Sequence, residues 1–108
     1  MLQDRLDSTR SVTGKIIRLT HVQWFHIVES HDYMAGNLGI IMETINAPDY
    51  IVKGSRGEKI AIKAYAQSNL GKKHCVVVYR ENGDGFVITA FLTSKPESIK
   101  KGGVLWPK

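Results

Sequence analysis

The chain has 108 residues, with 15 Lys and Arg, 10 Asp and Glu, and one cysteine. This length predicts a single domain that can bury a core without disulfides. The longest apolar stretches are too short to cross a membrane, so no membrane partner is expected. A lone cysteine and the lack of a secretory signal favour a cytoplasmic protein.

The charge is unevenly distributed along the chain. Residues 1–52 carry a net charge of −2, whereas residues 53–108 carry +7. A strongly basic half favours an anionic partner, and nucleic acid is the usual candidate. The alternative is a lysine-rich surface that only contacts solvent. The sequence leaves the oligomeric state open.

The first dozen residues are polar and lack a hydrophobic period. They predict a flexible N-terminal tail over 1–12, followed by one domain over 13–108. Residues 15–19, KIIRL, are expected to form a short strand or the lead-in to a helix.

Two helices are predicted next. The first covers about 21–30 and is capped by Thr20. The second covers about 32–46, with Asp32 as its cap and a break near its start, because glycine is a poor helix former. Pro48 ends it.

Four strands are expected after the helices, at residues 50–53, 59–65, 74–80 and 86–93, and residues 104–106 could add a short edge strand. The apolar runs of the strands at 74–80 and 86–93 mark the centre of the sheet, where Val76, Val77, Val78, Ile88 and Ala90 should be nearly buried. Helices followed by a strand meander indicate an α+β fold. The expected architecture is two N-terminal helices packed on one face of an antiparallel sheet of about four strands.

The last two strands form a hairpin that could carry an anion site. Side chains alternate between faces, so Val87, Thr89, Phe91 and Thr93 are expected to share one face. An even-length loop places Arg80 on that face, with Lys95 just past the strand end. A cation and hydroxyls suit a phosphate. The alternative is that the threonines are ordinary strand residues and that the arginine only flanks a turn.

Three of the four histidines, His21, His26 and His31, are five residues apart. Each step turns roughly 140° around a helix, which argues against a helix-borne metal site. No metal or other cofactor is expected. His31 lies where the first helix should end, so it could turn toward His26, and the two imidazoles could then act as general base and general acid. The alternative is that they are surface or capping residues.

Taken together, three short motifs carry a resemblance. Residues 24–31, WFHIVESH, resemble a W-x-H-I-x-x-x-H helix motif, and TINAPD at 44–49 and ITAFLT at 88–93 follow in order. Over residues 15–106 the chain resembles the phage-associated nuclease-like domains grouped with barnase, EndoU, tRNA-cleaving colicins and RelE-type toxins. The resemblance implies two helices on a four-stranded antiparallel sheet and metal-independent RNA cleavage in many members. His26 and His31 match its helix histidines, and Thr89 and Thr93 match polar positions of its late strand.

The sequence therefore suggests a small ribonuclease-like enzyme. One histidine would take the proton from a ribose 2′-hydroxyl, which attacks the adjacent phosphorus, and the other would protonate the leaving 5′-oxygen. Arg80 and Lys95 would stabilise the phosphoryl charge, and Thr89 and Thr93 would orient the group. Two alternatives stay open. One is a non-catalytic RNA- or protein-binding module, and the other is a toxin-like enzyme silenced by a cognate inhibitor protein.

Overall fold

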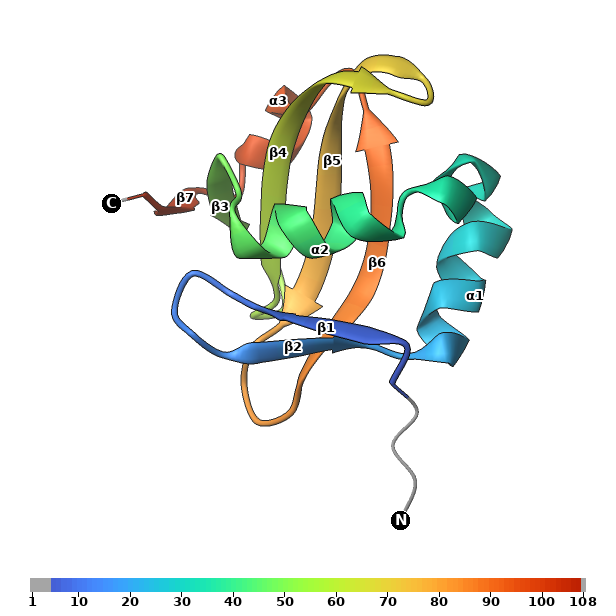
Figure 1. Cartoon of the computed structure of the whole chain (residues 1–108). Helices are drawn as coiled ribbons and strands as arrows, with labels where there is room; N and C mark the ends of the chain where they lie inside the picture. The colour runs from blue at the N-terminus through green and yellow to red at the C-terminus, as the bar shows by residue number, and fades with distance from the viewer. Residues whose placement is uncertain (1–4, 108) are drawn as a thin grey trace.

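The structure is a computed structural model, and it describes residues 5–107. Seven strands and three α-helices are distributed along the chain (Figure 1). The strands are β1 (Asp7–Arg10), β2 (Ile16–Leu19), β3 (Tyr50–Lys53), β4 (Lys59–Ser68), β5 (Gly71–Arg80), β6 (Gly85–Thr93) and β7 (Val104–Trp106). The helices are α1 (His21–Ser30), the 3₁₀ helix η1 (Asp32–Gly36), α2 (Leu38–Asn46) and α3 (Glu97–Lys100).

The strands form one mixed sheet in the order β1-β2-β6-β5-β4-β3-β7. Strands β3 to β6 are the meander that the sequence predicts, joined by antiparallel pairing. At one side, β2 pairs in parallel with β6 through Ile17 and Gly85. At the other side, β7 adds to β3.

The predicted architecture of two helices on a four-stranded antiparallel sheet is therefore wrong. The sheet has seven strands and is mixed, and two of the strands precede the first helix. Residues 7–10, inside the segment 1–12 expected as a tail, form β1 and pair with β2. The signal was missed because DSTR has no apolar alternation, and this strand is stabilised by its partner rather than by its own pattern. The first four residues of that segment lie outside the described residues.

The helices follow the prediction more closely. The Thr20 hydroxyl caps α1 by accepting a hydrogen bond from the Gln23 backbone N–H at 3.1 Å. The expected second helix is divided into η1 and α2 at Asn37, so the break near its start is present. Asp32 begins η1, but its side chain does not cap α2.

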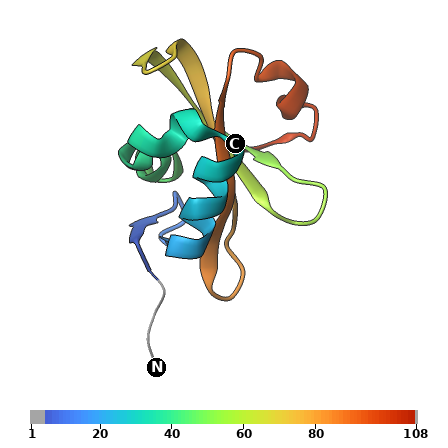
Figure 2. The same ribbon diagram turned by 90° about the vertical axis from the view of Figure 1, so that its right-hand side faces the viewer.

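The two faces of the sheet are covered by different helices. On the first, here named the α2 face, Ile41 and Ile45 of α2 join one buried core with Cys75 and Val77. The opposite face, here named the α3 face, holds a smaller core that includes Val76 and Ile99. Seen from the side, α2 and α3 lie on opposite sides of the sheet (Figure 2).

The centre of the sheet lies where the sequence predicts it. Val76, Val77 and Ala90 are fully buried, whereas Val78 and Ile88 are only half-buried. A β-bulge explains part of the difference, because the register shifts between Val78 and Tyr79 and leaves Ile88 without an opposing residue.

Residues of α1 and η1 cover the open edge of β6. The Gln23 side-chain amide donates a hydrogen bond to the Ile88 carbonyl. The Tyr33 hydroxyl accepts a hydrogen bond from the Leu92 N–H at 3.2 Å. β2 pairs with only the first residues of β6. Further along β6, side chains of α1 and η1 provide hydrogen-bond partners for backbone groups that an exposed strand edge would leave unpaired.

A buried carboxylate fixes the β1–β2 hairpin to the rest of the sheet. Glu81, at the end of β5, accepts hydrogen bonds from the hydroxyls of Ser11 and Thr13 and from the Lys59 ammonium. Burial alone would raise the pKa of this carboxyl, but the three donors outweigh burial and hold the pKa below its usual range. The carboxylate is therefore charged at neutral pH.

Candidate nucleic-acid interface

The late hairpin places the expected phosphate-binding residues on one face. Val78 pairs with Thr89, Val76 with Phe91 and His74 with Thr93, so both threonines lie on the α3 face. Arg80 is two residues beyond Val78 on the same strand and shares this face. Val87 does not, because the bulge turns it to the α2 face, where it joins the main core.

His31 lies beside this row of residues. Its ring centroid is 5.7 Å from that of Phe91, at an interplanar angle of 37°. Its Nδ1 is 3.4 Å from the Tyr33 hydroxyl, which also contacts the backbone of Leu92. The end of α1 at Ser30 frees His31 from the helical rotation, and the Tyr33 and Phe91 rings then hold the imidazole at the edge of β6.

A second histidine, His74, was missed by the sequence analysis. It pairs with Thr93 across β5 and β6, so the two side chains are neighbours on the α3 face, with Cβ atoms about 5 Å apart. The alternation of β5 already places His74 on the face of Val76 and Arg80, and this signal was available in the sequence. We name the group of His31, His74, Phe91 and Thr93 the β6 cluster.

His26 lies on a different part of α1. Its side chain is 58% exposed, and Nδ1 is 3.9 Å from the Glu29 carboxylate. It follows Trp24 by about 200° around the helix, and Trp24 packs on the main core. His26 therefore lies on the opposite side of α1 from that core, and residues 5–107 show no contact between His26 and His31.

Of the two expected cations, Arg80 lies away from the β6 cluster, whereas Lys95 lies beside it. Arg80 pairs with Phe86, five residues before Phe91, which is roughly 16 Å along an extended strand. Its guanidinium donates a hydrogen bond to the Arg56 carbonyl at 3.1 Å. Lys95 is exposed, and its backbone N–H donates to the Thr93 hydroxyl at 3.1 Å. The two cations therefore lie near opposite ends of β6.

Thiol and metal chemistry have less support in the described part of the chain. Burial raises the pKa of the Cys75 thiol to about 11, so this thiol stays protonated at neutral pH. Residues 5–107 contain no group of three or more His, Cys, Asp or Glu side chains placed to hold a metal ion. Among the same residues, none of the helices has the length and apolar character needed to span a bilayer.

Comparison with models of known families, with curated proteins and with solved structures finds no match to this chain.

Proposed function

We propose that the protein binds RNA across the α3 face of β6 and cleaves it without a metal ion. The observation that carries this proposal is the β6 cluster, in which His31 lies against Phe91 and His74 lies beside Thr93. Two imidazoles, a hydroxyl and an aromatic ring at one end of a strand provide proton transfer, phosphate contact and base stacking.

The chemistry assigned to this cluster is transfer of the phosphodiester bond to the neighbouring 2′-hydroxyl. A neutral imidazole removes the 2′-proton, O2′ forms a bond to phosphorus, and the bond to O5′ breaks. A protonated imidazole gives its proton to O5′. The products are a 2′,3′-cyclic phosphate and a 5′-hydroxyl, and no oxidant or metal is consumed. His31 takes one of these roles, and His26 or His74 takes the other.

A second candidate function is RNA binding without cleavage. It is favoured by the position of Arg80, which lies roughly 16 Å along the strand from the level of Phe91 and is bound to the β3–β4 loop. In that case Lys95 alone of the two expected cations lies beside the cluster to stabilise phosphoryl charge. The first proposal includes a cytoplasmic location and a cognate inhibitor protein.

The test is an RNA-cleavage assay in the presence of EDTA with purified protein. We expect 2′,3′-cyclic phosphate ends and a rate at least ~10²-fold lower for His31→Ala, the usual effect of losing a general acid or base. His26→Ala and His74→Ala are compared under the same conditions, and the variant with the larger loss identifies the partner of His31.

His21→Ala is the control on the same helix, since His21 lies about 140° around α1 from His26. Thermal unfolding of every variant separates loss of chemistry from loss of fold. If the protein binds RNA but leaves it intact, the second candidate is correct. Absence of both binding and cleavage would contradict both.

A further inference from the structure

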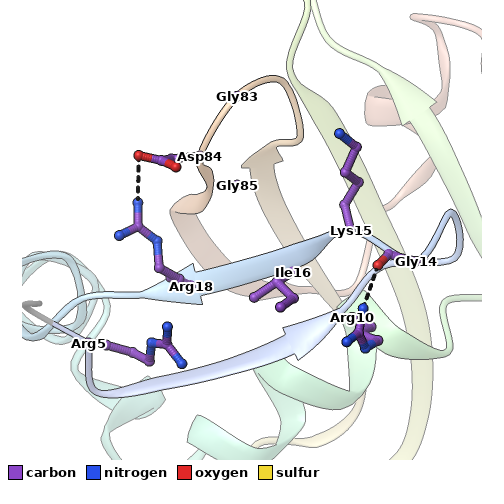
Figure 3. A pocket seen from close by; sticks show the side chains of 9 residues that line it. All are labelled: Arg5, Arg10, Gly14, Lys15, Ile16, Arg18, Gly83, Asp84 and Gly85. Carbon is purple, nitrogen blue, oxygen red and sulfur yellow. Dashed lines mark hydrogen bonds and ion pairs between the residues drawn. The ribbon is translucent and has the colours of Figure 1, made fainter.

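A cleft of about 470 Å³ lies on the outer side of the β1–β2 hairpin, next to the turn between β5 and β6 (Figure 3). Four cations line it: Arg5, Arg10, Lys15 and Arg18. These are all the lysines and arginines of residues 1–52, the half of the chain that is net acidic. The net charge of residues 1–52 therefore does not indicate this site, because the site forms only when folding brings four dispersed cations together.

One acidic side chain faces these cations. Asp84 lines the cleft, and its carboxylate is 3.8 Å from the Arg18 guanidinium, while the Asp84 side chain is 90% exposed. Among the described residues that line the cleft, four are cationic and one is acidic, so this lining is net positive. A cleft lined by one sign of charge concentrates the field and raises the local concentration of anions.

The geometry of the cleft is fixed by close backbone contacts. A Cβ on Gly85 would lie 2.7 Å from the Ile17 side chain and closer still to the Ile16 carbonyl, so only glycine lets β6 begin against β2. Arg10 donates a hydrogen bond to the Gly14 carbonyl at 2.9 Å, which holds the hairpin turn. The cations are thus presented on a rigid support.

The cleft also has an apolar component. Ile16 lines it and is 47% exposed, although it lies between charged residues. Small-molecule sites have volumes of about 300–1,000 Å³, and this cleft lies within that range. The size and lining suit a nucleotide segment, with phosphates against the cations and a sugar or base against Ile16.

We propose that this cleft binds adjacent phosphates of an RNA strand, as a second binding region separate from the β6 cluster. The proposal rests on the proposed function for the identity of the ligand. Strand β6 connects the two regions, because Gly85 at its start lines the cleft and Phe91 near its end contacts His31. An RNA strand that follows β6 would reach both.

The experiment measures the binding of a labelled single-stranded RNA at several salt concentrations. The variant Arg5→Gln/Lys15→Gln removes two cleft cations, and Arg10 is retained because it holds the turn. The control Lys53→Gln/Lys101→Gln removes the same charge from exposed positions that lie outside the cleft and away from β6. We expect the slope of log affinity against log salt to fall by about 1.4 for the cleft variant, since each phosphate that a cation neutralises on a single strand adds about 0.7 to the slope. The slope of the control should fall by less.

Asp84→Asn tests the sign of the effect. Removing the carboxylate should tighten RNA binding about two- to fivefold, the scale of one exposed charge pair. Glu97→Gln, an exposed acid on α3, should have little effect. Equal losses of affinity for the two double variants, or weaker binding by Asp84→Asn, would overturn the proposal.

A probe other than RNA distinguishes failure of the proposed function from failure of the cleft proposal. Titration with inorganic tripolyphosphate should shift the NMR amide signals of Gly83 and Gly85, which line the cleft, more than those of β6 near Phe91. These shifts without any RNA binding would contradict the proposed function and support a phosphate site. The absence of these shifts would overturn the cleft proposal.

Discussion

The hydroxyl of Tyr33 contacts both backbone groups of Leu92: it accepts from the N–H at 3.2 Å and is 3.4 Å from the carbonyl oxygen. The same oxygen is 3.4 Å from His31 Nδ1. Tyr33 therefore connects the strand edge to the histidine that we assign to catalysis. The single hydroxyl proton can go to the Leu92 carbonyl or to the imidazole, so the tautomer of His31 and the hydrogen bond at the strand edge are coupled.

Tyr33→Phe should remove this hydrogen bond and keep the ring. A Leu92 N–H without its partner costs about 1–3 kcal/mol when it is shielded from water. The free energy of unfolding should fall by about that amount, and the Leu92 amide should exchange faster with solvent. Tyr50→Phe is the control, because its ring keeps the interaction with Lys100. An unchanged Leu92 exchange rate would contradict the assignment.

Glu81→Gln should destabilise the fold in a pH-dependent manner. The folded pKa of Glu81 lies below the ordinary value near 4.5. The charged form therefore stabilises the fold above that value, and the contribution is lost as pH falls toward the folded pKa. At pH 7 the cost should be about 2 kcal/mol, the scale of hydrogen bonds to a charged group.

The measurement is the free energy of unfolding of both proteins from pH 7 to pH 3. The difference between wild type and Glu81→Gln should shrink as pH decreases. Glu97→Gln, on exposed α3, should show no comparable trend. A difference that grows on acidification would refute this account of Glu81.

Two glycine-to-alanine substitutions should have opposite signs. Gly85→Ala should destabilise the fold because its Cβ would overlap Ile16 and Ile17. Gly39→Ala should stabilise the protein by about 0.4–1 kcal/mol, since the glycine is inside α2 and nothing lies within 4 Å of the added Cβ. Urea unfolding of the two variants tests both signs, and a neutral Gly85→Ala would mean that β2 and β6 are further apart.

Substitutions at one buried and one exposed apolar residue of α1 test how this helix packs on the core. Ile27 is 1% exposed and Val22 is 59% exposed. Ile27→Ala should cost about 2–5 kcal/mol because it leaves a cavity. Val22→Ala should stay within about 0.5 kcal/mol, as for other surface changes. Similar costs at both positions would mean that α1 packs through a different side.

Local chemistry made much of the central fold predictable. The turn residues 82–85 and the apolar run at 75–79 indicate the hairpin of β5 and β6, and Thr20 marks the start of α1. The added strands were less predictable. The strand expected as one possibility for residues 15–19 is confirmed by β2, but β1 is polar and was missed, and the parallel pairing of β2 with β6 depends on a partner distant in sequence.

Some residues of the candidate site could likewise be predicted from the sequence, and others could not. Thr89 and Thr93 share a face because strands alternate, and alternation can be read from sequence. His74 was available from the same rule. The cations of the cleft could not be found by segment charge, because Arg10 and Arg18 come together only through the register of β1 and β2.

The parallel pairing of β2 with β6 also has a consequence for biosynthesis. The ribosome makes β2 before both of the longer helices and before β3 to β6, so Arg18 finds its partner Phe86 only after all of these have been made. Pairing between such distant segments forms slowly, since a long loop must close first. The nascent chain therefore carries the four cations of the cleft without their supporting turn, and it acquires the complete anion-binding surface only after β6 has been made.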